Sequence, residues 1–180
     1  MRDEVEVSVI IPCYNEEAVL GECQRRVSAV LDAMGIAYEC VYVDDGSSDN
    51  TWLQLRAMQE ASGGRVVAVS LSRNFGHQPA VSAGLTLVRG KAVVILDADL
   101  QDPPELIPEM VKMWRAGSEV VYGVRESRAG ETGFKVWTAR KTSLTSPWSV
   151  GSRSSRNRPE AALSRYSRDS GMKRCINVVI

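Results

Sequence analysis

Residues 93–104 read VVILDADLQDPP, and this stretch decides both the fold and the candidate site. Four apolar residues run directly into Asp97-Ala98-Asp99, which is the pattern of a buried strand that ends in a polar loop. Side chains alternate along a strand, so Asp97 and Asp99 are expected on the same side. Neighbouring carboxylates repel each other unless a positive group lies between them, and Mg²⁺ or Mn²⁺ is the simplest such group. The alternative is that both carboxylates are solvated at the mouth of a loop.

Length, charge and cysteine content limit the classes of protein to consider. The 180 residues favour one domain, and 22 basic against 22 acidic residues give no support for nucleic-acid binding. The four cysteines are widely spaced and there is one histidine, so core thiols are expected rather than a zinc site or a disulfide framework. No apolar run reaches the roughly 20 residues that span a bilayer, and the acidic start MRDEVEV does not resemble a signal peptide, which favours a cytoplasmic location.

Strands and helices are predicted to alternate along the chain. Short β-branched runs predict strands at residues 5–11, 38–43, 66–71, 92–96 and 119–122. Apolar periodicity, N-cap residues and prolines predict helices at residues 16–34, 51–60, 79–88 and 105–115. Asn15 is expected to cap the first helix, and Gly35 to end it. This order is typical of an α/β domain with a mostly parallel sheet.

A polar loop follows each predicted strand. These loops read NEE, DDGSSD, SRNFGHQ, DADLQ and GVRESR. Ligands of open α/β sheets bind outside the carboxyl ends of the strands, so the five loops are expected to converge on one rim. His77, in the third loop, is interpreted as a residue near that site. The chain has no GxGxxG after its first strand and no GxxxxGK[ST] motif, which argues against a NAD enzyme and a P-loop nucleotide site.

The alternating pattern decays after about residue 136. Residues 142–171 are crowded with Ser and Arg and have little periodicity, a composition typical of irregular structure. We therefore divide the chain into a domain at residues 1–135 and a Ser/Arg-rich tail at residues 136–180. A solvated tail without a partner is favoured over one that binds RNA or anionic lipid, and a disrupted coding sequence is a third interpretation.

Five motifs together resemble the family 2 glycosyltransferases with the GT-A fold. They are VSVIIPCYNEE, VYVDDGSSDNT, LSRNFGHQPAVSAGL, ILDADLQDPPELIPEM and VVYGVRESRAGE, within about residues 5–135. DADLQDPPELIP is most similar to enzymes that act on polyprenyl phosphates, such as dolichol-phosphate mannose synthases and bactoprenol glucosyltransferases. The resemblance implies a Rossmann-like GT-A sheet flanked by helices, with an irregular C-terminal tail. It also implies inverting transfer of a hexose from a UDP- or GDP-sugar to a dolichyl or undecaprenyl phosphate, with Mg²⁺ or Mn²⁺.

The same resemblance implies roles for individual residues. Asp99 would be the direct metal ligand, with Asp97 and Gln101 nearby. The catalytic residues would be Asp97, Asp99, Gln101 and Arg125. The substrate-binding residues would be Pro12, Tyr14, Glu16, Asp44, Gln78, Ala98, Arg128 and Lys135.

Local structural roles are the alternatives to these assignments. In these alternatives, Pro12 ends the first strand, Tyr14 packs within its loop and Glu16 interacts with a helix dipole. Asp44 is equally suited to cap a helix, and solvated surface charge is the default for arginine and lysine. For Asp45 and Ser47 we favour capping of the helix that follows them.

The chain departs from the family pattern after Lys135. Related enzymes continue into helices, an acidic acceptor-site motif and usually C-terminal membrane segments. We therefore expect a truncated or frame-shifted chain that keeps the donor half of a glycosyltransferase, at the cytoplasmic face of a membrane. The alternatives are a non-catalytic nucleotide-sugar-binding fragment and a glycosyltransferase with a soluble or polysaccharide acceptor. The sugar and the oligomeric state stay open.

Overall fold

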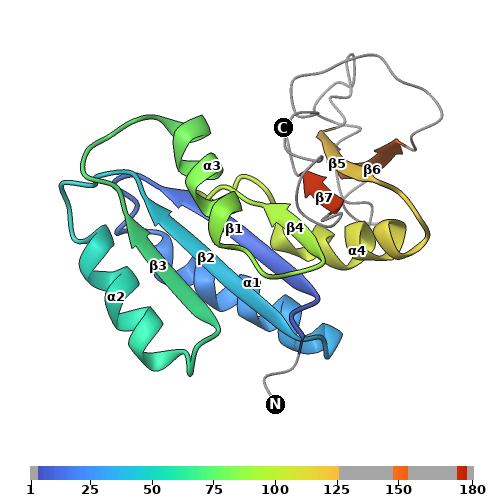
Figure 1. Ribbon diagram of the computed structural model, residues 1–180, viewed down its shortest axis with the longest axis horizontal. Coiled ribbons are helices and arrows are strands. Elements are labelled where there is room, and N and C mark those ends of the chain that lie inside the picture. The colour runs from blue at the N-terminus through green and yellow to red at the C-terminus, as the bar shows by residue number, and fades with distance from the viewer. Residues whose placement is uncertain (1–3, 126–147, 154–173, 178–180) are drawn as a thin grey trace, which may run out of the picture.

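A five-stranded parallel sheet forms the centre of the molecule (Figure 1). The computed structural model describes residues 4–125, 148–153 and 174–177. The strand order is β3-β2-β1-β4-β7. The strands are β1 (Val7–Cys13), β2 (Tyr38–Asp44), β3 (Val66–Ser70), β4 (Ala92–Ile95) and β7 (Arg174–Asn177). The α/β class and the parallel sheet predicted from the alternating pattern are confirmed.

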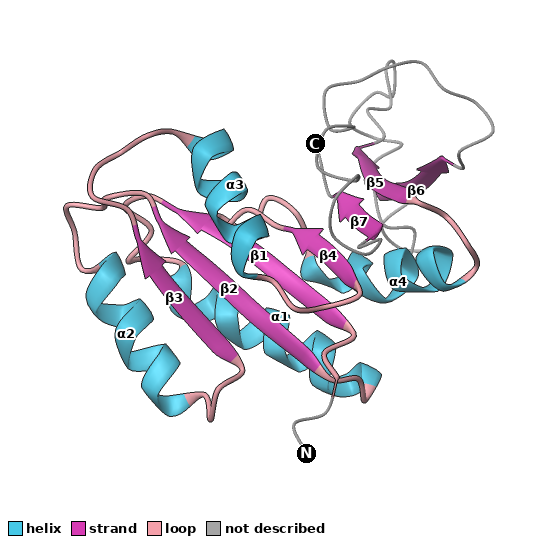
Figure 2. Cartoon of the chain, viewed as in Figure 1, coloured by secondary structure: helices cyan, strands magenta, loops and turns pink. Residues whose placement is uncertain are grey.

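Helices cover both faces of this sheet (Figure 2). They are α1 (Leu20–Met34), α2 (Thr51–Ala61), α3 (His77–Leu87), the single turn η1 (Pro104–Leu106) and α4 (Ile107–Arg115). One apolar core joins α1, α2 and α4 to one face, and a second core joins α3 to the opposite face. Strands β1 and β2 are therefore buried along their whole length, which explains their nearly continuous apolar sequences.

The first helix starts later than its sequence predicts. It begins at Leu20, after a loop and turns, and its N-cap residue is Val19 without a side-chain hydrogen bond. The prediction that Asn15 caps this helix is wrong, because Asn15 has a φ of 57° and bonds instead to the loop after β2. Gly35 ends the helix as predicted, with a left-handed φ of 63°.

The fifth predicted strand lies outside the parallel sheet. Strand β5 (Val120–Arg125) pairs antiparallel with β6 (Trp148–Arg153) in a separate two-stranded sheet. The position beside β4 is taken instead by β7. The expectation that the GVRESR loop joins the same rim through a parallel strand is therefore corrected. The C-terminal region, for which we predict irregular structure, supplies the two short strands β6 and β7.

Three cysteines lie in the core as free thiols, as predicted. Cys13, Cys23 and Cys40 are buried. Burial raises the pKa of Cys23 to about 11 and that of Cys40 to about 12, so both thiols stay protonated at neutral pH. Within the described part of the chain, every helix is too short or too polar to cross a membrane.

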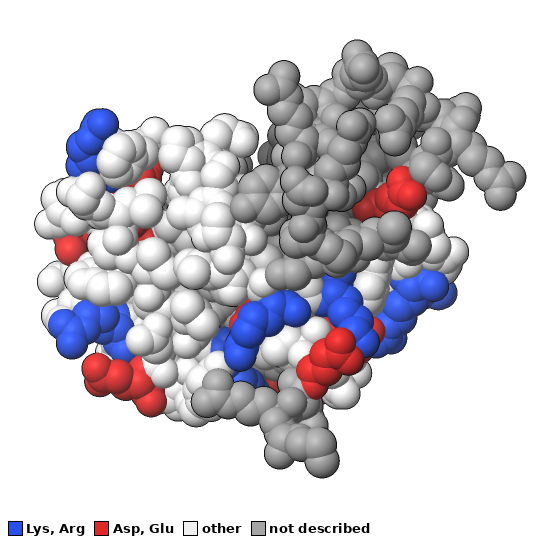
Figure 3. All heavy atoms as spheres, viewed as in Figure 1, with Lys and Arg blue, Asp and Glu red and all other residues white. Residues whose placement is uncertain are grey.

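The amino ends of the strands are held by a buried carboxylate. Glu39, whose side chain is 1% exposed, accepts hydrogen bonds from Ser8 Oγ at 2.7 Å and from the backbone N–H of Arg89 at 2.6 Å. The Arg89 guanidinium lies 2.7 Å from the second oxygen of Glu39. Exposed ion pairs such as Lys91–Glu4 surround this edge, and Figure 3 shows basic and acidic side chains next to each other in the lower part of the view. Charges at the amino edge are thus mutually compensated.

Candidate active site

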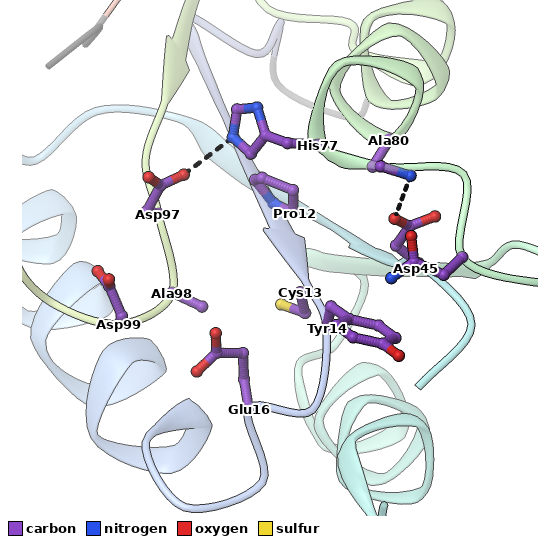
Figure 4. Close-up of a pocket in the computed structure, with 12 residues that line it drawn as sticks. Pro12, Cys13, Tyr14, Glu16, Asp45, His77, Ala80, Asp97, Ala98 and Asp99 are labelled. Carbon is purple, nitrogen blue, oxygen red and sulfur yellow. Dashed lines mark hydrogen bonds and ion pairs between the residues drawn. The ribbon is translucent and has the colours of Figure 1, made fainter. Parts of the chain in front are cut away.

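A cavity of about 280 Å³ opens at the carboxyl ends of β1, β2 and β4 (Figure 4). Its size is close to the lower end of the range for small-molecule sites. The loops after four strands, together with the first turn of α3, supply its walls. The lining residues are Pro12, Cys13, Tyr14, Glu16, Asp45, Asn74, Gly76, His77, Ala80, Asp97, Ala98 and Asp99. Four of the five polar loops singled out in the sequence therefore converge, as predicted.

Hydrogen bonds join the loop after β1 to the loop after β2. The backbone N–H of Asn15 donates to Ser47 Oγ at 2.9 Å, and Ser48 N donates back to Asn15 Oδ1 at 2.8 Å. The backbone N–H of Glu16 donates to Thr51 Oγ1 at 2.8 Å. These bonds hold Asn15 in its left-handed conformation and bring the Glu16 side chain to the cavity wall.

Asp45 ties the loop after β2 to the loop before α3. Its carboxylate accepts hydrogen bonds from the backbone N–H groups of Phe75 and Gly76, both at 2.8 Å. The predicted capping of α2 by Asp45 and Ser47 is therefore wrong, since Ser47 Oγ serves the loop after β1. At the start of α2, it is Asp49 that accepts a hydrogen bond from Thr51 N, at 2.9 Å.

Asp97 and Asp99 both line the cavity, as predicted, but they lie in the loop beyond β4, which ends at Ile95, and Ala98 between them lines the same cavity. Asp97 Oδ1 lies 3.0 Å from His77 Nε2, and Asp99 Oδ1 accepts a hydrogen bond from Gln101 N at 3.0 Å. The second oxygen of each carboxylate accepts no hydrogen bond from the described residues. Leu100 follows with a φ of 61°, and its side chain packs against the larger core. Each aspartate is thus held by one oxygen and leaves the other available.

The cavity wall carries an excess of negative charge. Among the described lining residues, four carry carboxylates and one is a histidine, while none is Lys or Arg. Burial raises the pKa of Glu16 above its ordinary value of 4.5, and the carboxylates of Asp99, Asp49 and Asp97 raise it further. A cation among these groups would relieve their repulsion.

The donor set fits a hard divalent cation. Carboxylate oxygens are the ligands that Mg²⁺ and Mn²⁺ prefer. Within residues 4–125 and the two short C-terminal strands, no group of three or more acidic, His or Cys side chains forms a closed metal cage. This agrees with a cation that takes one or two protein carboxylates and completes its coordination with water and a phosphate ligand.

The structure brings together some of the predicted site residues and separates others. The predicted residues on the cavity wall are Pro12, Tyr14, Glu16, Asp97, Ala98 and Asp99. Asp44 is 1% exposed and accepts hydrogen bonds from Ser47 N and Ser70 Oγ, so it lies beneath the rim. The exposed residues Gln78 and Gln101 are close in sequence to the wall but do not line it.

Three predicted residues cannot be related to the cavity. Arg125 ends β5, and its backbone pairs with Trp148. Arg128 and Lys135 lie outside the described residues. Conversely, the wall includes several residues to which we had assigned no binding role, namely Cys13, Asp45, Asn74, Gly76 and Ala80. Asn74 and Gly76 belong to the SRNFGHQ loop. Because this loop follows a predicted strand, its position in the sequence indicates that both residues lie near the site.

Comparisons with known proteins agree with this arrangement. The family model described as glycosyl transferase family 2 matches residues 8–174. The chain is 45% identical to the uncharacterized glycosyltransferase YkcC of Bacillus subtilis over 139 residues, which are 77% of this chain and 43% of that protein. It is also 45% identical to the undecaprenyl-phosphate 4-deoxy-4-formamido-L-arabinose transferase of Pseudomonas paraeruginosa, over 81% of this chain and 42% of that one. The chain thus spans less than half the length of these curated relatives.

A solved structure has a similar fold. The mannosyltransferase PcManGT of Pyrobaculum calidifontis, in complex with GDP-Man and Mn²⁺, superposes with a TM-score of 0.54. The two sequences are 28% identical, and the superposition covers 65% of this chain and 34% of that one.

Proposed function

Because the chain belongs to glycosyl transferase family 2, we propose that its cavity binds the diphosphate and sugar of a nucleotide-sugar donor. The observation that carries this proposal is the excess of carboxylates on the cavity wall, whose described residues include no Lys or Arg. A nucleoside diphosphate is itself anionic, so it binds such a wall only through a cation. In the complex of PcManGT, the nucleotide sugar GDP-Man and Mn²⁺ occur together, which supports the proposal.

The metal site is proposed at Asp99, with Asp97 and Gln101 nearby. Both aspartates line the cavity, and each has one oxygen that accepts no hydrogen bond from the described residues. When bound, Mg²⁺ or Mn²⁺ offsets the negative charge that develops on the departing nucleoside diphosphate. The negative charges of Asp97 and Asp99 also repel a diphosphate that is not bound to the cation. Either metal fits the carboxylate ligands of this site.

The donor is proposed to extend from the metal towards the loop after β1. Tyr14 is 47% exposed at the rim, and Pro12 and Ala98 form apolar parts of the wall. We assign Tyr14, Glu16 and Asp44 to the nucleoside, with Asp44 reaching it only if the bonds to its carboxylate rearrange. Contacts to phosphate groups are assigned to the remaining polar and basic residues, namely Gln78, Arg125, Arg128 and Lys135.

The acceptor of the whole enzyme is proposed to be a polyprenyl phosphate. The relative from Pseudomonas paraeruginosa carries an undecaprenyl-phosphate acceptor in its name, which supports this choice. The second pKa of a phosphate monoester is roughly 6, so the attacking oxygen is largely ionised at neutral pH. An inverting displacement by such an acceptor needs less help from a general base than attack by an alcohol. A lipid-linked acceptor also implies work at a membrane face.

Calorimetric titration with UDP- and GDP-sugars, with and without Mn²⁺, tests the donor site. We expect binding of at least one donor in the presence of Mn²⁺ and its loss without the metal. Equal binding under both conditions, or none under either, would contradict the proposal. Transfer of labelled sugar to undecaprenyl phosphate in detergent micelles then tests the acceptor. Donor binding without transfer favours the alternative of a non-catalytic fragment, whereas transfer only to a polysaccharide identifies a different acceptor.

A further inference from the structure

A histidine and an aspartate lie next to each other on the cavity wall (Figure 4). His77 Nε2 lies 3.0 Å from Asp97 Oδ1, and the two side chains are 51% and 50% exposed (Figure 4). His77 is the first residue of α3, whereas Asp97 follows β4, so the contact joins two segments that both line the cavity. No other hydrogen bond connects the described side chains of these two loops.

The proton in this contact belongs to the imidazole. An ionised carboxylate is only an acceptor, so the Nε2–H of His77 must donate to Asp97 Oδ1. The bond fixes the Asp97 carboxylate through one oxygen and leaves Oδ2, which accepts no hydrogen bond from the described part of the chain. The imidazole therefore orients Asp97 without occupying the oxygen that a cation would use.

The backbone that carries His77 is itself anchored. Gly76 precedes it with a φ of 99°, and the N–H of Gly76 donates to Asp45 Oδ2 at 2.8 Å. The N–H of Ala80 donates to the Gly76 carbonyl at 3.2 Å, which closes the first turn of α3. Asp45 follows directly from β2, so His77 is fixed to the centre of the sheet. A side chain on such a support can hold its partner in one orientation.

Stability alone does not account for this contact. Half-exposed ion pairs and hydrogen bonds contribute little to folding, whereas outer partners of metal-ligating carboxylates change metal affinity by about 10- to 100-fold. We infer that His77 is a positioning residue, which holds the Asp97 carboxylate for the divalent cation of the donor site. This inference rests on the proposed function.

Binding of Mn²⁺ alone, followed by the loss of the free-ion signal in electron paramagnetic resonance, tests the inference on the full chain. Replacement of His77 by Phe (H77F) removes the donor and keeps a planar ring, and we expect Mn²⁺ affinity to fall by about 10-fold or more. Replacement by Gln (H77Q) restores an N–H donor and should recover part of the loss. Ser82→Ala, at an exposed position of α3 that does not line the cavity, is the control and should bind Mn²⁺ like the wild-type chain.

A double-mutant cycle separates positioning from direct ligation. If His77 acts only through Asp97, the D97A and D97A/H77F chains bind Mn²⁺ equally. H77F affinity equal to wild type, or additive losses in the double mutant, would overturn the inference, the second because it makes His77 an independent ligand. A wild-type chain that does not bind Mn²⁺ would instead overturn the proposed metal site, and the inference with it. Thermal melting of each variant confirms that it is folded.

Discussion

Acidic side chains have different partners at the two ends of the parallel sheet. At the amino end, Glu39 is fully buried, yet its oxygens accept hydrogen bonds from Ser8 and from both the backbone and the guanidinium of Arg89. At the carboxyl end, Asp97 and Asp99 are more exposed, yet no Lys or Arg is found among those cavity-lining residues that the structure describes. The fully buried charge of Glu39 is therefore balanced inside the protein, whereas the charges of Asp97 and Asp99 are not balanced by Lys or Arg among the described residues of the cavity wall.

This difference separates stability from function within a single sheet. A buried carboxylate must find its partners inside the protein, or folding loses several kcal/mol. Carboxylates on a cavity wall can bind a cation from solution instead. Binding of the cation relieves the repulsion between them, which contributes to its affinity. The amino end is therefore expected to control folding, and the carboxyl end to control ligand binding.

Removal of the arginine at the amino end should have the largest effect on stability. Arg89→Met leaves the buried Glu39 without its cationic partner, and we expect a loss of about 3 kcal/mol in the free energy of unfolding. Mn²⁺ affinity should not change, because the cavity lies at the other end of the sheet. Urea denaturation measures the stability loss. Lys91→Met, which breaks the exposed pair with Glu4, is the control and should lose less than about 1 kcal/mol. Equal losses in the two variants would contradict the role of Glu39.

A methyl group at Gly46 should disturb the loops of the carboxyl end by a smaller amount. Gly46 has a φ of 69°, and a Cβ atom there would lie 2.5 Å from the Arg73 carbonyl carbon. We expect Gly46→Ala to lower the free energy of unfolding by about 1–3 kcal/mol. Gly63→Ala is the matched control, since Gly63 has a φ of 63° with open space around it. The difference between the two variants in urea denaturation isolates the close contact, and equal losses would show that the contact is easily relieved.

Neutralisation of Glu16 should have the smallest effect, and in the stabilising direction. The folded state raises the pKa of Glu16, so its ionisation opposes folding at neutral pH. Glu16→Gln should therefore stabilise the metal-free chain, by less than about 1 kcal/mol because solvent screens the charges. The gain should fade as the pH falls through the raised pKa, where wild-type Glu16 also becomes neutral. Thermal melting between pH 4 and pH 7 measures this, using roughly the span over which a glutamate titrates. A gain that persists at low pH would have another cause.

Local sequence signals sufficed for strands β1 to β4 of the parallel sheet and for the place of the cavity. β-branched runs followed by polar residues identified β1 to β4, and the rule that parallel strands end at one edge brought Glu16, Asp97 and Asp99 to one wall. Asp97 and Asp99 were expected on one side from the alternation of side chains along a strand, but β4 ends at Ile95, and the loop after it brings Asp97, Ala98 and Asp99 together to the cavity.

Contacts between distant residues could not be predicted in the same way. The left-handed conformation of Asn15 depends on Ser47 and Ser48, which lie more than thirty positions away in the chain. Aspartate is a residue type that often caps helices, but the Asp45 carboxylate accepts hydrogen bonds from two backbone N–H groups of the loop before α3 instead. The edge beside β4 could be filled by either β5 or β7, and local propensity does not distinguish the two.

Thermal melting with and without Mn²⁺ tests the central claim, that the carboxyl end of the sheet is a cation site. A ligand that binds only the folded state stabilises it by about 2.7 kcal/mol at a concentration of 100 times its Kd. We predict that Mn²⁺ raises the melting temperature of the wild-type chain and leaves that of Asp99→Asn nearly unchanged. An equal rise in both chains, or no rise in the wild-type chain, would contradict the claim.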